Sequence, residues 1–411
     1  MPMPRHGGEE TTLPKSIRLT DVPLKSAEHL TSFQRLMTLA RETVPHLSAE
    51  AARAAVRGAG DALGLNFIET KGIAPTFALL PSGGAAPKIT FYCTWHSETL
   101  PVTPAAAEGA ERLALVITLA ALSDLAAAGI EGVGAAALVV APGAAHGSLV
   151  LDPFLREHQA GIASPVGFWL RVLPSAPRRR RIYLGGRGRV VIGLWGGDAN
   201  PYEIRDTIAT TLHEAAYGPR PLDFELIRKL AASREALEFL EETIEAPEAA
   251  TSDGEWRLRS ALFEAHGQII RPGASHPDRP SAWLSIEIAE GMEAPDIHAR
   301  IRALAPDSRV EMAEALPWDR IGIHHPAIKA LIPLTKSRSA GPDIWPCAPW
   351  VTPSGVFSRA TGMPLVEWGI PLGQGNAVRF PKAEAFRAME EEAVELALRA
   401  LEAFEESPQV P

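Results

Sequence analysis

The sequence predicts an α/β fold in which one α/β domain is split in two by a smaller, inserted α+β domain. In the first part, an apolar strand at Lys88–Tyr92, an Ala/Leu-rich helix at Glu111–Ala128 and a second apolar strand at Gly134–Val140 follow one another. This alternation is typical of a parallel sheet that helices cover on both faces. Between Arg189 and Ala315 the pattern changes to strand, helix, strand, helix, strand, the outline of a small α+β layer. The α/β pattern then returns.

The composition indicates a globular chain long enough for two or three domains. The chain has 411 residues, of which 46% are apolar, so it can bury sizeable cores and is not a disordered chain. It carries 40 Lys and Arg against 49 Asp and Glu, and the resulting charge of −9 disfavours sequence-independent binding of nucleic acid. Two cysteines are too few for a disulfide scaffold or a cysteine-rich zinc module.

No segment has the pattern of a targeting signal or of a membrane span. Met1–Glu10 contains too few apolar residues for the apolar region of a signal peptide. Leu113–Val140 is the most apolar stretch, but Asp124 and Glu131 interrupt it, which favours a buried helix followed by a buried strand. From this absence of signals we expect a cytoplasmic protein that binds neither membrane nor nucleic acid.

The other elements of the split domain follow from residue types. Ser26 and Ser48 are good N-cap residues, and the alanine-rich run after Ser48 predicts a helix. The expected elements are a largely helical segment Ser26–Asn66, strands Phe67–Glu69 and Thr76–Leu80, helix Pro326–Leu334, strand Leu365–Trp368 and helix Lys382–Ala403. On the last helix, we interpret the run Glu390–Glu392 as a face exposed to solvent.

The inserted domain is built from shorter predicted elements. Pro201 lies near the first turn of an expected helix, where its missing N–H costs little. The expected elements are strand Arg189–Trp195, helix Asn200–Ala215, a charge-rich helical segment Phe224–Glu245, strand Ala282–Ala289, helix Pro295–Ala303 and strand Arg309–Ala315.

One motif connects this fold to a chemistry. The segment Lys88–Pro101, KITFYCTWHSETLP, ends a buried strand with His96-Ser97-Glu98 and places Pro101 three residues later. The motif resembles the Gly-His-x-Asp-x-x-Pro loop of the zinc-dependent peptidase family M20, which includes aminoacylases, carnosine dipeptidases and succinyl-diaminopimelate desuccinylases. In that family the His binds zinc and the acidic residue orients it. By this resemblance, His96 stands at the ligand position and Glu98 at the position of the Asp.

Further segments resemble the family in order and spacing over residues 26–405. They are Val139–Leu151 at a Glu-Glu-x-x-Ser segment, Ile182–Gly188 at the entry to the lid domain, Asn200–Glu214 and Ser281–Leu304 within the lid, Ser354-Gly355 at a Gly-Gly-Ser-type loop and Asn376–Glu384 at an Asn-Ala-His segment. The resemblance implies the two-domain metallopeptidase-type fold of the dipeptidase-like subgroup. Residues 1–185 and 316–411 would form the catalytic-type α/β domain, and residues 186–315 the lid and dimerisation domain, so a homodimer is expected.

The sequence departs from the family at most of the metal positions. A dinuclear zinc site needs about five ligands and a general-base Glu. The two adjacent glutamates of the family fall on Ala144-Ala145, the last His falls on Val378-Arg379, and a ligand Asp falls near Ser164-Pro165. The bridging Asp has no counterpart other than Glu108 or Glu111. We therefore predict that the zinc site is lost and that no cofactor is bound.

A small set of candidate site residues remains. His96 and Glu98 could form an acid–base pair in which the carboxylate fixes the imidazole tautomer, or they could be remnants held by local hydrogen bonds. His146 would join them if neighbouring strands end at one edge of the sheet, although a solvent-exposed loop imidazole is the simpler interpretation. The predicted catalytic residues are His96, Glu98 and His146, and the predicted substrate-binding residues are Ser148, His325, Ser354, Gly355 and Asn376.

Two other chemistries are disfavoured. Cys93 lies on an apolar strand, where a thiol is buried rather than reactive, so we expect a structural role for it. The run Gly185-Gly186-Arg187-Gly188 lacks the strand-to-helix context and the lysine of a phosphate-binding loop, and we expect a hinge between domains.

Three functions are compatible with these residues. The chain could act without the metal pair on an amino-acid-like or peptide-like small molecule, or bind one, in the cleft between the domains. It could be a pseudoenzyme whose dimer has a structural or regulatory role. It could also be an active amidohydrolase whose rebuilt zinc site uses His96, Glu98, His146 and Glu108 or Glu111.

Overall fold

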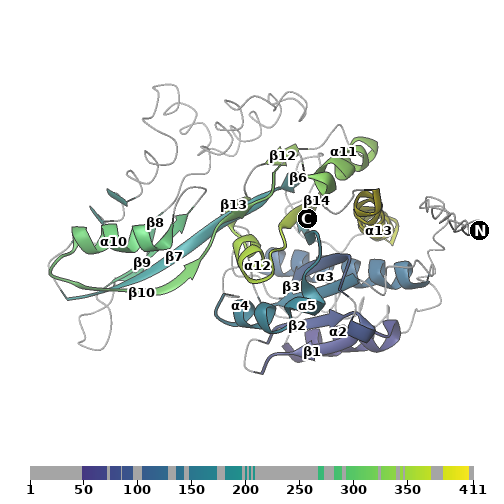
Figure 1. Cartoon of the computed structure of the whole chain (residues 1–411), viewed down its shortest axis with the longest axis horizontal. Coiled ribbons are helices and arrows are strands. Elements are labelled where there is room, and N and C mark those ends of the chain that lie inside the picture. The colour runs from purple at the N-terminus through teal and green to yellow at the C-terminus, as the bar shows by residue number, and fades with distance from the viewer. Residues whose placement is uncertain are drawn as a thin grey trace, which may run out of the picture.

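A computed structural model of the chain shows two sheets, one in each of two unequal parts of the molecule (Figure 1). The structure describes residues 49–71, 75–84, 86–95, 104–127, 136–142, 148–173, 181–196, 200, 203–204, 207–208, 267–272, 282–288, 293–322, 325–338, 343–345, 348–371 and 383–406. The predicted helical segment Phe224–Glu245 and most of the predicted helix Asn200–Ala215 lie outside these residues.

The larger sheet has eight strands in the order β1-β2-β4-β3-β5-β14-β6-β12. Their bounds are β1 Asn66–Glu69, β2 Phe77–Leu80, β3 Ile89–Thr94, β4 Ala136–Ala141, β5 Gly167–Leu173, β6 Arg181–Tyr183, β12 Asp343–Trp345 and β14 Leu365–Pro371. The four central strands β4, β3, β5 and β14 are parallel to one another. Their near-continuous apolar sequences fit this position, because a parallel sheet is buried on both faces.

Helices cover the larger sheet on both sides, so that it separates two apolar cores. The first core receives side chains from α2 Ala49–Leu63, α3 Pro104–Ala127, α11 Pro326–Arg338 and α13 Ala383–Glu406. The second receives them from α4 Ser148–Glu157, α5 Gln159–Ile162 and α12 Ser354–Thr361. Side-chain alternation along β3 places Phe91 and Cys93 in the first core and Tyr92 in the second.

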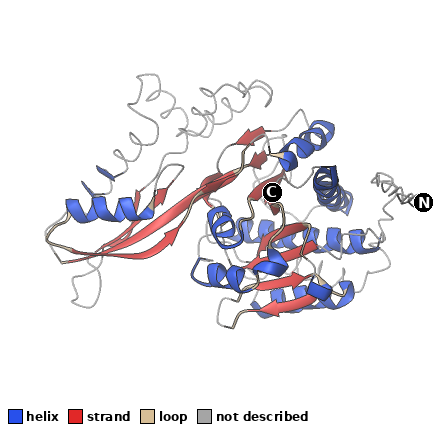
Figure 2. Cartoon of the chain, viewed as in Figure 1, coloured by secondary structure: helices blue, strands red, loops and turns tan. Residues whose placement is uncertain are grey.

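The smaller sheet extends away from the α/β part, as the strands of Figure 2 show. Its main path is β10-β7-β9-β8, formed by β7 Gly185–Trp195, β8 Gly267–Pro272, β9 Ala282–Ile288 and β10 Arg309–Leu316, and α10 Ala294–Leu304 packs on one face. The two short strands β11 Asp319–Arg320 and β13 Ala348–Val351 pair with the start of β7. The fold is therefore the mixed α/β, two-sheet architecture that the sequence predicts, although the exact domain boundaries at 185/186 and 315/316 stay predictions.

Glycines at the start of β7 allow main chains to pack against one another without intervening side chains. A Cβ at Gly185 or Gly188 would overlap with the main chain of residues 316–320, and one at Gly186 would overlap with the Thr352 side chain. Arg187 O accepts a hydrogen bond from Thr352 N, at 3.0 Å, in the same place. The Gly-Gly-Arg-Gly run thus forms a close-packed crossing of strands between the two sheets, as expected for a connection between domains rather than for a phosphate loop.

The apolar stretch Leu113–Val140 forms a buried helix and a buried strand, as predicted. The helix α3 begins at Pro104, seven residues before the predicted start at Glu111. No helix in the described part of the chain is long and apolar enough to cross a membrane.

The interpretation of Glu390–Glu392 as a solvent-exposed face is wrong. Glu390 and Glu392 are 2% and 0% exposed, because they lie on the side of α13 that packs against the larger sheet and α3. The indole Nε1 of Trp368 donates a hydrogen bond to Glu392 Oε1, at 3.0 Å. Glu390 is hydrogen-bonded to Asp124 of α3, and burial together with this neighbouring carboxylate raises the pKa of Glu390 to about 8.

The raised pKa predicts how pH changes the stability of the protein. The ordinary pKa of this carboxyl is 4.5, so the folded protein holds the proton over a range in which the unfolded chain releases it. The stabilisation is complete below pH 4.5 and is lost as pH rises through about 8. Glu390→Gln removes this titration, so its melting temperature relative to that of the wild type should rise between pH 5 and pH 9. A difference in melting temperature that stays constant over that range would contradict the raised pKa of Glu390.

Candidate functional site

The four parallel strands of the larger sheet end at one edge, here called the carboxyl edge. Thr94 at the end of β3 pairs with Ala141 at the end of β4, and Val172 of β5 pairs with Ile370 of β14. Loops that leave neighbouring parallel strands meet at such an edge, which is where open α/β sheets bind ligands. The segments that follow β3, β4 and β14 in the sequence contain the predicted site residues His96, Glu98, His146 and Asn376, and all four lie outside the described residues.

Trp95, the last described residue before the His96 segment, is held by two hydrogen bonds, one of which joins the ends of β3 and β4. Trp95 N donates to Ala141 O at 3.0 Å, and the Trp95 indole Nε1 donates to Pro75 O at 3.2 Å. His96 is the next residue after Trp95, and His146 follows Ala141 by five residues. The two imidazole-bearing segments therefore begin from neighbouring, fixed points of the carboxyl edge.

A buried ion cluster lies at the same edge, and sequence reasoning missed it. Arg171 of β5 donates from Nη2 to Glu111 Oε1 at 3.1 Å and from Nη1 to Glu367 Oε1 at 3.2 Å. The other oxygen of the Glu111 carboxylate accepts a short hydrogen bond from Thr94 Oγ1. These residues come from β5, α3, β14 and β3, so one cluster joins three central strands to the helix that follows β3.

The environment of Arg171 keeps its charge in place. Its side chain is 2% exposed, and its guanidinium carbon lies 4.6 Å from the centroid of the Trp169 ring, over the ring face. Burial alone would lower the pKa of Arg171, but the carboxylates of Glu367 and Glu111 together outweigh burial and raise that pKa. The guanidinium is therefore a permanent cation inside the protein, and two carboxylates bind it.

Two aromatic residues below the cluster bury polar atoms. Tyr92 and Trp169 are paired across β3 and β5, with their rings edge to face at 5.6 Å between centroids. Within the described structure, neither the Tyr92 hydroxyl nor the Trp169 Nε1 has a hydrogen-bond partner. Burial, and after it the Glu111 charge, raises the pKa of Tyr92, so this phenol stays neutral and cannot serve as a base.

Cys93 has the structural role that its sequence position predicts. Its side chain is 0% exposed, and its Sγ lies 3.3 Å from Thr118 Oγ1. Burial raises the pKa of the Cys93 thiol to about 12, so the nucleophilic thiolate is not formed near neutral pH.

Among the residues considered for a rebuilt metal site, the structure describes the side chain of Glu111 alone. Glu111, a predicted replacement for the bridging Asp, binds Arg171 and Thr94 and is 4% exposed. Glu108 lies on α3, and its side chain is outside the described structure. Among the described residues, no group of three or more His, Cys, Asp or Glu side chains could hold a metal ion. Because His96, Glu98 and His146 are not among them, the loss of the metal stays a prediction.

The structure places Ser354 and Gly355 at the start of α12, beside the strand crossing. The hydroxyls of Ser354 and Thr352 are 2.7 Å apart, and Ser354 is 3% exposed. A Cβ at Gly355 would overlap with the carbonyl of Pro317, so Gly355 serves close packing. Ser148 is the first residue of α4, and its side chain is outside the described structure. Their predicted contacts with a substrate stay predictions.

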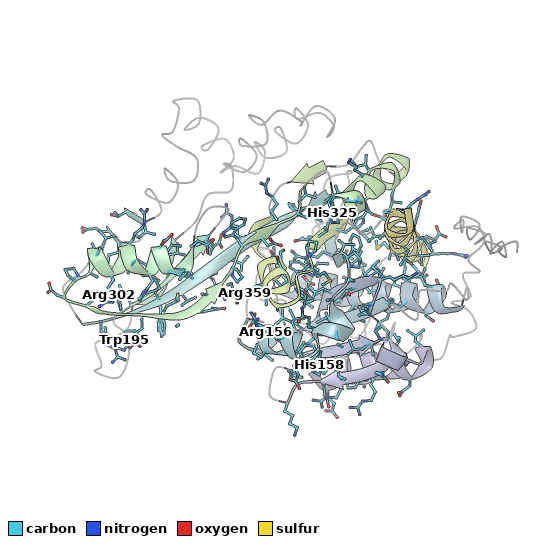
Figure 3. All side chains as sticks on the ribbon, in the orientation of Figure 1. Arg156, His158, Trp195, Arg302, His325 and Arg359 are labelled. Carbon is cyan, nitrogen blue, oxygen red and sulfur yellow. The ribbon has the colours of Figure 1, made fainter. Side chains whose placement is uncertain are left out.

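His325 precedes α11 and supports the start of that helix (Figure 3). Ala327 N donates to His325 Nδ1 at 3.3 Å, so Nδ1 is an acceptor and the neutral ring carries its proton on Nε2. Burial lowers the pKa of His325, which favours this neutral form. The structure thus gives His325 a helix-capping contact, while its predicted contact with a substrate stays a prediction.

Comparison with solved structures shows that the chain has the fold of M20 family metallopeptidases. An M20 family metallo-carboxypeptidase from Sulfolobus solfataricus matches with a TM-score of 0.56 and 14% identity, over 88% of this chain and 99% of that one. Human carnosine dipeptidase 1 matches with a TM-score of 0.56 and 13% identity, over 94% and 100%. The di-peptidase Dug1p from Saccharomyces cerevisiae matches with a TM-score of 0.53 and 13% identity, over 96% and 100%.

By sequence alone, the chain matches no protein-family model and no curated protein. The likeness to these structures therefore concerns the fold, and the chemistry has to be argued from the residues of the carboxyl edge.

Proposed function

We propose that this protein binds an amino-acid-like or peptide-like small molecule at the carboxyl edge, between its two domains, and acts on it without a dinuclear metal. The Trp95–Ala141 hydrogen bond carries the proposal, because it fixes together the two strand ends from which the His96 and His146 segments begin. The class of ligand is taken from the solved structures of the same fold, which are titled as a carboxypeptidase and as dipeptidases.

His96 would act as the acid–base group and Glu98 would fix its tautomer. An imidazole oriented by a carboxylate can take a proton from water or from a substrate amide and return it to a leaving group near neutral pH. His146 would be the second imidazole, and Asn376 would contact the ligand. None of these steps needs a metal ion, and Ala144-Ala145 cannot supply the carboxylates that a metal pair needs.

Metal analysis and variants of His96 test this proposal together. Protein purified without chelator should contain well under one equivalent of zinc per chain, and chelator should leave its ligand binding or hydrolysis unchanged. His96→Ala should lower hydrolysis of dipeptides or N-acyl amino acids by roughly 100-fold or more, the usual contribution of a general acid–base group.

The matched control is His298→Ala, because His298 is bonded through Nε2 to Val310 O within the inserted domain. This variant should keep the wild-type activity. Two equivalents of bound zinc on which activity depends would overturn the proposal, and so would a His96→Ala protein as active as the control.

A second candidate role is a homodimer with a structural or regulatory function. Leu304 and Met312 are 41% and 43% exposed and are the exposed large apolar side chains of the described structure, and both lie on the inserted domain. Met312 lies on β10, an outer strand of the path β10-β7-β9-β8. Leu304 lies on α10 and Met312 on β10, two elements that pack against each other, and exposed apolar side chains are a common feature of interfaces.

Sedimentation analysis tests this second role. The wild type should sediment as a dimer at micromolar concentration, and Met312→Glu should shift it to the monomer. Arg57→Glu, on the exposed surface of α2, is the control and should remain a dimer. A wild-type monomer would remove the proposal, as would a Met312→Glu protein that remains a dimer.

A further inference from the structure

The ion cluster at the carboxyl edge has the arrangement of a cation site whose cation belongs to the chain. The two carboxylates come from elements far apart in the sequence, because Glu111 lies 60 residues before Arg171 and Glu367 lies 196 residues after it. One oxygen of each carboxylate accepts a hydrogen bond from a different nitrogen of the same guanidinium, at 3.1 Å for Glu111 and 3.2 Å for Glu367. All three side chains are at most 5% exposed, so water hydrates their charged groups only weakly.

The two buried carboxylates explain why the Arg171 guanidinium is needed at this place. A buried carboxylate loses its hydration and needs a positive partner, and two of them near each other also repel one another. Arginine suits this place because its planar guanidinium is permanently charged and presents separate donors to two acceptors. Removing one partner of such a cluster leaves uncompensated charge inside the protein.

The cluster also reaches the segment on which the proposed chemistry depends. Glu111 Oε1 binds Arg171, and Glu111 Oε2 binds the Thr94 hydroxyl at the end of β3. Thr94 is followed by Trp95, which is bonded to the end of β4, and then by His96. The Glu111 carboxylate therefore connects Arg171, through hydrogen bonds, to Thr94, the residue that precedes Trp95.

We propose that Arg171 is a resident cation that holds the Glu111 and Glu367 carboxylates as a bound metal ion would. A divalent ion on either carboxylate would face the fixed positive charge of Arg171 and would be disfavoured. This inference about the buried charges is independent of the proposed function.

Charge-changing variants of the three residues test this inference. Arg171→Met keeps an apolar stem of similar length but removes the charge, and its melting temperature should fall by roughly 10 °C. Arg171→Lys keeps the charge and should recover part of this loss. The triple variant Arg171→Met, Glu111→Gln, Glu367→Gln carries no charge at the cluster and should be more stable than Arg171→Met.

The pH dependence separates a role of charge from a role of packing. In Arg171→Met, the two carboxylates would take up protons to remove their charges, so the loss of melting temperature relative to the wild type should shrink from pH 8 to pH 5. Among the described residues, Tyr92 on β3 and Tyr183 on β6 also interact with Arg171, and neither is a carboxylate. The Glu390–Asp124 pair is present in both proteins, so its titration cancels in the comparison.

Each result decides the inference. A pH-independent loss of melting temperature in Arg171→Met would overturn it, as would an Arg171→Met protein that melts within about 2 °C of the wild type. If Arg171→Met does not fold, the triple variant decides: folding supports the resident cation, and failure to fold overturns it. Two equivalents of zinc in a wild type that gives the expected variant results would overturn the proposed function alone.

Discussion

One buried guanidinium, bound by two buried carboxylates, restricts how the elements at the carboxyl edge of the larger sheet are placed. Arg171 lies on a central strand, and its partners Glu111 and Glu367 lie on the helix after β3 and on the next strand of the sheet. A buried ion cluster tolerates little displacement, because its desolvation is compensated only when every hydrogen bond is made. The relative positions of α3, β5 and β14 at the carboxyl edge are therefore strongly restricted.

The buried cluster lies at the carboxyl edge of a fold that is shared with M20 metallopeptidases. Four parallel strands end at this edge, and open α/β sheets bind ligands at such an edge. At that edge, the described carboxylates serve an internal cation, and the adjacent alanines at 144 and 145 supply none. The glycines at the start of β7 preserve the close crossing between the two sheets. The chain thus combines the M20-type fold with a buried Arg–Glu cluster at the carboxyl edge.

Sequence patterns predicted the helices and strands that neighbouring residues in the sequence determine. The apolar run around Leu113–Val140 predicted α3 and β4, and the alternating run at Ala282–Ala289 predicted β9 within one residue. The strand β5, GFWLRVL, was missed because a charged residue near its end breaks the expected apolar run. That residue is Arg171, whose partners lie 60 and 196 residues away, and no local pattern shows such a pairing.

The candidate site was predicted only in part, for the same physical reason. Glu111 was identified as a possible bridging ligand from its position, but its actual partners could be found only from the folded structure. The Glu390–Glu392 run looks solvent-exposed by composition, and its burial depends on Trp368 and on Asp124 of another helix. Burial of Cys93 was predicted correctly, because an apolar strand determines it locally.

Anomalous diffraction shows directly whether these two carboxylates bind a metal ion. Crystals grown from protein purified without chelator, and then exposed to zinc, would be measured on both sides of the zinc absorption edge. The expected result is Arg171 between Glu111 and Glu367, with no anomalous peak within bonding distance of either carboxylate. A zinc peak bound to Glu111 or Glu367, with the guanidinium displaced, would contradict it.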